Sequence, residues 1–195
     1  MKKMHWYNTS NLPSKNYICG HCNNDISSNK GYYLANSHNS GMSGNGYVYV
    51  CHKCNKPTYI SGSLQVPGAT YGKKYDEQIF NGDKLLFQLY EEARNNMKVM
   101  SFTSVGLCCR KLLMHIAVNC GAEENLKFID YINYLDKNNY IPKNAKMWVD
   151  IIRDKGNEAN HEIMLLDQED AKKLLTFIEI LISLIYDMPY IAKNI

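Results

Sequence analysis

The spacing of hydrophobic residues changes near residue 73. Before that point, short aromatic and β-branched runs such as Tyr32-Tyr33-Leu34 and Tyr47-Val48-Tyr49-Val50 alternate with turns rich in Gly, Asn and Ser. These runs, with a third at Thr58-Tyr59-Ile60, predict short β-strands. Residues 61–72, which include Pro67-Gly68, are predicted to be a linker.

From residue 76 onward, apolar residues recur every three or four positions, which is the spacing of amphipathic helices. Gly121 is placed to end the second helix, and Asp167 with Asp170 is arranged like a capping box at the start of the last one. The predicted helices begin near residue 76 and then span about 103–120, 123–136, 145–154 and 167–185. The pattern therefore predicts an α+β, mainly α fold, with a small unit of short strands at 1–72 and a bundle of about five helices at 73–195.

Two Cys-x-x-Cys pairs, Cys19 with Cys22 and Cys51 with Cys54, are separated by 28 residues in the predicted strand region. A gap of two residues lets both thiolates of a pair reach one tetrahedral ion, and the longer separation fits a strand pair that joins the two turns. The sequence therefore predicts a zinc ribbon with one structural Zn²⁺ per chain. His21 and His52 lie inside the pairs and are expected to be exposed.

Iron in a rubredoxin-like centre has the same ligand set and stays open as an alternative. A thioredoxin-like redox pair expects a single Cys-x-x-Cys at the start of a helix, a context that neither pair has. So small a unit, poor in aliphatic residues, also needs a metal to fold. Cys108, Cys109 and Cys120 fall on or beside the apolar stripe of the second predicted helix and are assigned to the core.

The net charge of +3 conceals an asymmetry. Residues 1–74 contain eight lysines and one acidic residue, Asp25, which gives +7 with histidine neutral, whereas the remainder carries −4. Four thiolates on a divalent ion would lower the N-terminal value by two, and the sign still favours phosphate. The nearby aromatic residues can stack on unpaired bases, preferably of RNA, or cover a small core: Trp6, Tyr7, Tyr32, Tyr33, Tyr47 and Tyr49.

Composition also bears on location. A hydrophobic content of 45% with 21% charged residues is typical of a folded soluble protein. The most apolar stretch, 174–191, is interrupted by Glu179, Asp187 and Pro189, so we expect a core helix and no membrane partner. No apolar segment follows Lys2 and Lys3 as in a secretion signal, which predicts a cytoplasmic protein. Without a Gly-rich phosphate loop, a kinase or nucleotidase is not expected.

The segment 151–162 gathers polar groups between two apolar helices. If it is helical, Asn157 and His161 share a face, and the imidazole titrates near neutral pH, which suits acid–base chemistry on RNA. Alternatively, Gly156 ends a helix and His161 bonds the backbone of a connecting turn.

Three sequence blocks together resemble the family called domain of unknown function 4145, within the HEPN (higher eukaryotes and prokaryotes nucleotide-binding) superfamily. These are Leu89-Tyr90-Glu91-Glu92-Ala93, Cys109-Arg110-Lys111-Leu112-Leu113 and Gly156-Asn157-x-x-x-His161, and the resemblance covers about residues 80–188. Members often carry a zinc ribbon in front of the helical domain, as predicted here.

Many HEPN proteins are dimeric, metal-independent ribonucleases of prokaryotic defence and toxin systems with an Arg-polar-x-x-x-His motif. The resemblance implies that Asn157 is the polar residue and His161 the histidine, while Gly156 stands at the arginine position. Arg153 or Arg110 would then assist, although Arg110 can instead pair with a carboxylate. The implied function is a nucleic-acid-binding homodimer of prokaryotic or phage defence or counter-defence, acting as an endoribonuclease.

A non-catalytic dimeric module with a degenerate site, which docks on a partner protein, is the alternative. Loss of the motif arginine at Gly156 favours this module, and retention of Asn157 and His161 favours the ribonuclease. Nucleotide binding without turnover also stays open.

Overall fold

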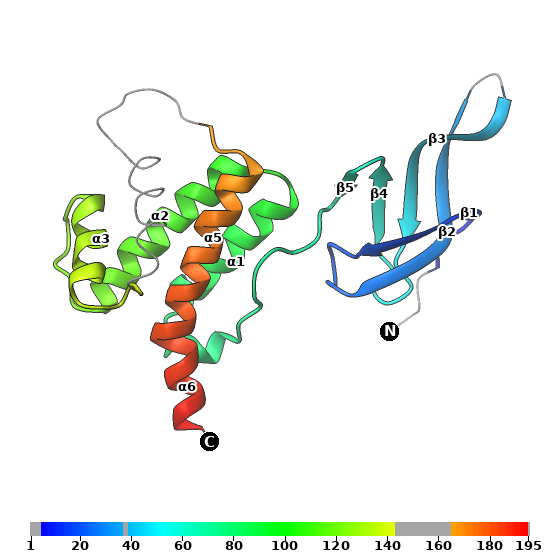
Figure 1. Cartoon of the computed structure of the whole chain (residues 1–195). Helices are drawn as coiled ribbons and strands as arrows, with labels where there is room; N and C mark the ends of the chain where they lie inside the picture. Colours follow the sequence, from blue (N-terminus) through cyan, green and yellow to red (C-terminus); the bar gives the residue numbers. More distant parts are fainter. Residues whose placement is uncertain (1–4, 37–38, 143–164, 195) are drawn as a thin grey trace. The chain divides into compact units, whose positions relative to one another are not determined.

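The structure is a computed structural model that describes residues 5–36, 39–142 and 165–194. The chain forms two compact units, Met1–Thr70 and Tyr71–Ile195 (Figure 1). The first unit contains the strands and the second contains the helices.

The N-terminal unit is one antiparallel sheet of five strands, arranged in chain order so that each strand pairs with the next. The strands are β1 (Ser10–Ile18), β2 (Asp25–Asn36), β3 (Asn39–Val50), β4 (Pro57–Ser61) and β5 (Leu64–Val66). A small core lies on this sheet and includes Leu12, Tyr17, Ile26, Tyr49 and Ile60.

Two of these strands differ from the sequence prediction. β1 was not expected, because its buried residues Leu12 and Tyr17 are five positions apart instead of alternating. A register shift in its pairing with β2 between Asn11 and Lys15 produces this irregular spacing. β5 lies inside the predicted linker, where Ser61 pairs with Leu64 across a tight turn.

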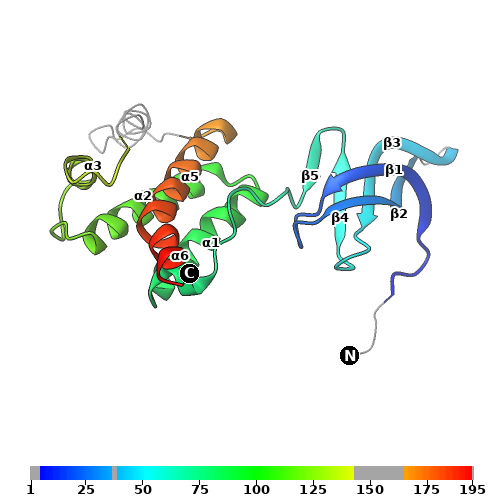
Figure 2. The same ribbon diagram turned by 60° about the horizontal axis from the view of Figure 1, so that its bottom comes forward.

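The C-terminal unit is helical (Figure 2). Its helices are α1 (Lys84–Lys98), α2 (Phe102–Asn119), α3 (Phe128–Lys137) and α5 (Gln168–Ile182), preceded by a short 3-10 helix, Glu77–Phe80. α5 continues through a π-helical stretch, Ser183–Asp187, into α6 (Met188–Lys193) as one rod. Within the described ranges there are thus four long helices rather than about five, and the helix expected at 145–154 lies outside those ranges.

α2 is the central helix of this unit, since it packs against α1, α3 and α5. Its buried face includes Val105, Leu112 and Ile116, and the same core contains Cys108 and Cys109, as predicted. Cys120 is partly buried against that core. The predicted caps are present: Gly121 has a φ of +102°, and the Asp167 carboxylate accepts a hydrogen bond from the Asp170 amide at 2.8 Å.

Left-handed residues account for two helix boundaries that the apolar spacing misplaced. The first predicted helix is divided because Asn81 and Gly82 have φ angles of +53° and +87°. The third begins at Phe128 instead of near 123, because Asn125, with a φ of +61°, cannot continue a right-handed helix.

One helix of the described chain, Gln168–Lys193, is long and apolar enough to cross a membrane. Core helices of soluble proteins meet the same criterion, and Leu175, Phe177 and Ile178 of this helix are buried in the helical core.

Candidate metal centre

The order of the strands brings the four predicted cysteines together. Cys19 and Cys22 lie in the turn between β1 and β2, and Cys51 and Cys54 lie in the turn between β3 and β4. In an antiparallel sheet with strands in chain order, these two turns fall at the same end.

The four sulfur atoms all lie within 4.8 Å of one another. Cys19 Sγ is 3.7 Å from Cys54 Sγ, and Cys22 Sγ is 3.8 Å from Cys51 Sγ. A tetrahedral ion with metal–sulfur bonds of about 2.3 Å separates its ligands by about 3.8 Å. The arrangement can therefore hold one metal ion with little movement of the thiols.

The two turns have the same backbone geometry. Asn23 donates its amide to the Cys19 carbonyl at 2.7 Å, and Asn55 donates to the Cys51 carbonyl at 2.8 Å. Both asparagines have a φ of +56°, a left-handed conformation that Asn tolerates well. Sequence reasoning did not use these two residues, although the repeated Cys-x-x-Cys-Asn was visible and predicts a matched pair of turns.

Close packing restricts the first turn. A Cβ atom on Gly20 would lie 2.2 Å from the Gly68 carbonyl oxygen and 2.6 Å from that of Pro67, so the position requires glycine. His21 is exposed and its Nε2 lies 2.9 Å from the Pro57 carbonyl oxygen, which ties the first turn to β4. His52 is exposed too, as predicted.

Burial and hydrogen bonding shift the thiol pKa values in opposite directions. Burial acts to raise the pKa of Cys22, but hydrogen bonds from Asn24 outweigh burial and lower that pKa to about 6. Burial raises the pKa of Cys54 to about 12. A divalent ion would supply the positive charge that lets all four sulfurs ionise together.

An aromatic cluster, composed of Trp6, Tyr7 and Tyr32, lies beside the second turn. The Trp6 indole donates a hydrogen bond to the Asn55 carbonyl at 3.0 Å, and its ring meets that of Tyr32 edge-on at 6.2 Å. The Tyr32 hydroxyl donates to the Tyr7 carbonyl. Trp6 is 40% exposed and Tyr7 80% exposed.

The remaining tyrosines from the sequence prediction lie in the core of the sheet or against it. Tyr49 is buried, and Tyr33 and Tyr47 are partly buried against the sheet core. These three cover the core, whereas the aromatic cluster offers ring surface to solvent.

The predicted catalytic residues are only partly described. Arg153, Asn157 and His161 lie outside the described residues. Arg110 is in α2, where its guanidinium carbon lies 4.3 Å from the centre of the Phe128 ring, a cation–π contact with α3. That contact places the Arg110 guanidinium against the first residue of α3.

Comparison with known proteins identifies the helical unit. The family profile described as Domain of unknown function (DUF4145) matches residues 91–195, which is more than half of the chain. Searches of curated proteins and of solved structures give no match. The matched region contains α2, α3, α5 and α6, and the four cysteines lie before it. The chain belongs to the DUF4145 family.

Proposed function

We propose that the N-terminal unit is a zinc ribbon that binds unpaired RNA through the aromatic cluster and the lysines of the second cysteine turn. Zinc is the proposed ion because four thiolates with no open position suit a closed structural site. The ion would hold the two turns together. All contacts to RNA would come from the chain itself.

The observation that carries this proposal is the position of the aromatic cluster. The indole of Trp6 is held at Asn55, and the exposed residues Lys53 and Lys56 flank Asn55 in the chain. Exposed rings beside ammonium groups suit a single strand, since the bases can stack on the rings while the lysines contact phosphates. Paired bases have no free faces for stacking, so duplexes should bind less tightly.

The charge of the unit supports the same partner. Eight lysines against Asp25 leave residues 1–74 strongly basic. Lys15, Lys30, Lys53 and Lys56 are exposed. Affinity for RNA should therefore fall steeply with added salt, because each phosphate contact releases a counterion.

Fluorescence anisotropy with a labelled single-stranded RNA of mixed sequence tests the proposal. Replacing Trp6 and Tyr7 by Ala should weaken binding by about 5- to 100-fold, the range for loss of base stacking. Tyr59→Ala is the matched control, since Tyr59 is a 38% exposed tyrosine of the same sheet outside the cluster. Equal affinity of the double variant and the parent protein would refute the proposal.

The lysines are tested by the salt dependence of the same titration. Lys53→Gln with Lys56→Gln should reduce the slope of log affinity against log salt by about 0.7 for each lost phosphate contact. The matched pair Lys127→Gln and Lys137→Gln, both exposed in the helical unit, should leave the slope unchanged.

For the helical unit, family membership supports a second proposal, that it is HEPN-like and acts in prokaryotic or phage defence or counter-defence as a cytoplasmic protein. Asn157 and His161 would serve metal-independent RNA cleavage, with Arg153 or Arg110 as the assisting arginine. The alternative is a non-catalytic module that docks on a partner protein.

A cleavage assay with end-labelled RNA in EDTA, run on the parent protein and on His161→Ala, distinguishes the ribonuclease from the non-catalytic module. Cleavage by the parent alone, leaving 2′,3′-cyclic phosphate ends, supports the ribonuclease. Absence of cleavage by both proteins supports the non-catalytic module, and the ribbon proposal holds in both cases.

A further inference from the structure

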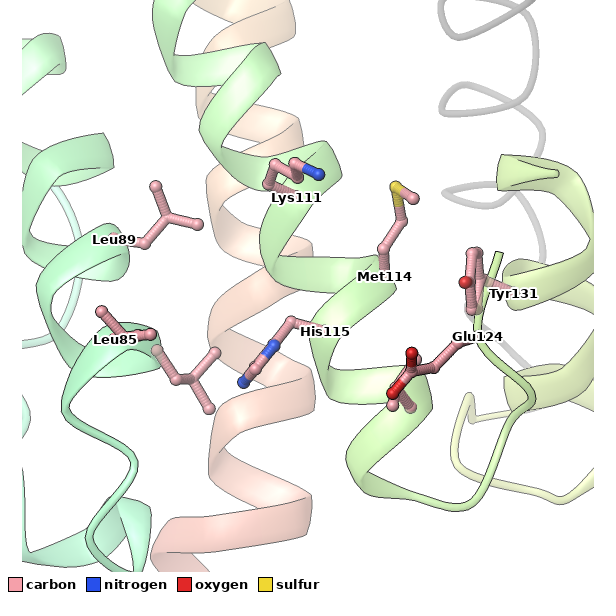
Figure 3. Close-up of a pocket in the computed structure, with 9 residues that line it drawn as sticks. Leu85, Leu89, Lys111, Met114, His115, Glu124 and Tyr131 are labelled. Atoms are coloured by element: carbon pink, nitrogen blue, oxygen red, sulfur yellow. The ribbon is translucent and has the colours of Figure 1, made fainter. Parts of the chain in front are cut away.

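A groove lies over one face of α2, between α1 and α3 (Figure 3). Leu85 and Leu89 of α1 lie on one side of α2, and Tyr131 of α3 lies on the other. The volume of the groove is about 510 Å³. Sites for small organic ligands usually measure about 300–1,000 Å³. The groove is therefore large enough for a small organic molecule.

The lining of the groove is mostly apolar. Leu85 is 73% exposed, and Leu89, Met114 and Val118 are half-buried beside it. Covering exposed apolar surface is favourable, and a methionine side chain adapts to ligands of different shape. The lining therefore favours a ligand with an apolar body, such as a set of aliphatic side chains.

The two ends of the groove carry opposite charges. Lys111 lies toward one end, and Glu124 lies toward the other (Figure 3). Both residues are exposed, and the ion pairs of the described part of the chain include neither of them. An ammonium group and a carboxylate at opposite ends complement a ligand that has a carboxylate at one end and an ammonium group at the other.

His115 adds a polar group to the same face of α2, four residues after Lys111. Its side chain is 43% exposed. Its Nε2 lies 2.6 Å from the Asp83 carboxylate, which also accepts a hydrogen bond from Asn119 at 3.0 Å. These contacts hold the imidazole in place and leave Nδ1 as the ring nitrogen that can bond an amide group of a ligand.

The length of the groove indicates how long the ligand is. Lys111 and Val118 are the first and last residues of α2 that line it, and this stretch of helix rises by about 10 Å. An extended peptide covers about 3.3–3.6 Å per residue, so a tripeptide spans about the same distance.

We propose that this groove binds a short peptide, about three residues long, with aliphatic side chains and two free ends. The carboxylate of the peptide lies at Lys111 and its ammonium group lies at Glu124, while its aliphatic side chains cover Leu85, Leu89 and Met114. All of these residues belong to the helical unit, so the test is independent of RNA binding by the ribbon.

Titration of the full, metal-loaded chain with alanyl-leucyl-leucine, followed by two-dimensional NMR, tests the proposal. Amide signals around Met114 and Val118 should shift and saturate at about 1 mM peptide or below. Leu85→Ser should weaken binding about tenfold, because part of the apolar wall is lost. Leu107→Ser is the matched control, since Leu107 is a 63% exposed leucine of α2 outside the groove, and it should bind the peptide normally.

Charge variants and blocked peptides test the orientation. Lys111→Met and Glu124→Gln should each weaken binding about two- to fivefold, as expected for exposed ion pairs. Lys137→Met and Glu123→Gln change exposed residues outside the groove and should have no effect. An N-acetylated peptide should bind the parent and Glu124→Gln equally, and a peptide with a C-terminal amide should bind the parent and Lys111→Met equally.

Three results would overturn the proposal. The first is the absence of saturating shifts up to about 5 mM peptide. The second is a Leu85→Ser variant that binds as tightly as the parent, or blocked peptides that lose no affinity. The third is octanoate, an apolar acid without an ammonium group, binding as tightly as the peptide, because the groove would then select a simple amphipathic acid.

Discussion

Arg94 illustrates how single residues of the helical unit bind the segment that follows the ribbon. The side chain belongs to α1 and is buried, with the residue 3% exposed. Its guanidinium contacts Glu91 Oε1 at 2.5 Å and donates to the carbonyl oxygens of Tyr71 at 3.3 Å and Gly72 at 3.2 Å. The charge is therefore paired with Glu91, and its other donors point at two backbone carbonyls.

Replacing Arg94 should destabilise the helical unit. Arg94→Met keeps much of the packing but removes the ion pair with Glu91 and the hydrogen bonds to two carbonyl groups, so the free energy of unfolding should fall by about 3 kcal/mol. Urea denaturation followed by far-UV circular dichroism measures this. Arg94→Lys keeps the charge but loses the fork of donors, and its loss should be smaller. A loss below about 1 kcal/mol for Arg94→Met would contradict this role.

The cysteine ligands were predictable at the scale of single residues, whereas the aromatic cluster was only partly so. Two Cys-x-x-Cys turns suffice to identify four metal ligands, because the spacing within each turn fixes how its thiols converge. The contact of Trp6 with Asn55 joins residues 49 positions apart and depends on where the N-terminal segment runs. Local patterns in the sequence carry no information about such a contact.

At the scale of elements, the start of α1 is fixed by a carboxylate that also reaches α2. Asp83 caps α1 by accepting the Leu86 amide at 3.0 Å, and its other oxygen lies 2.6 Å from His115 Nε2. Asn119 donates to the same oxygen at 3.0 Å. Burial acts to raise the pKa of Asp83, but these hydrogen bonds outweigh burial and lower it below its usual range.

The lowered pKa of Asp83 predicts a dependence of stability on acid. Since the folded pKa is below the unfolded value of about 3.9, the contribution is complete above that value and is lost as pH falls through the folded pKa. Asp83→Asn keeps a capping side chain but cannot titrate. The parent should therefore be more stable than Asp83→Asn at pH 7, and the difference should shrink below about pH 4.

Urea titrations of both proteins at pH 7 and pH 3, followed by helical circular dichroism, provide the measurement. A difference in unfolding free energy that is the same at both pH values would show that the carboxylate charge does not stabilise the helix.

Apolar spacing predicted the helices better than the strands. The buried positions of α2 and α5 recur at helical spacing, and the sequence shows a capping residue after α2 (Gly121) and before α5 (Asp167). Both helices therefore lie where the pattern placed them. β1 was not predicted because a register shift breaks the alternation of its buried and exposed residues. β5 was not predicted because three residues are too few to show a period. The start of α3 depends on the left-handed backbone at Asn125, which apolar spacing does not encode.

At the scale of the whole molecule, the two units differ in how much apolar core they contain. The described core of the ribbon has seven buried residues, two of which are the cysteines Cys19 and Cys51. The described part of the helical unit has a much larger core, with buried residues from α1, α2, α3 and α5. The ribbon should therefore depend on its metal for folding, and the helical unit should not.

Removing the metal should unfold only the ribbon. A strong chelator with a reducing agent would take away the ion while keeping the thiols reduced, so the amide signals of residues 5–66 should collapse in NMR spectra. Signals from α1, α2 and α5 should persist, and far-UV helical circular dichroism should change little. Loss of the helical signals together with those of the ribbon would contradict independent folding of the two units.

The central claim, a metal centre made of four thiolates, is tested most directly by zinc K-edge X-ray absorption on the purified protein, with metal content measured on the same sample. We expect one zinc per chain surrounded by four sulfur atoms at about 2.3 Å, and fewer sulfurs in Cys51→Ser. A sample without metal, or a first shell dominated by nitrogen or oxygen, would contradict the account.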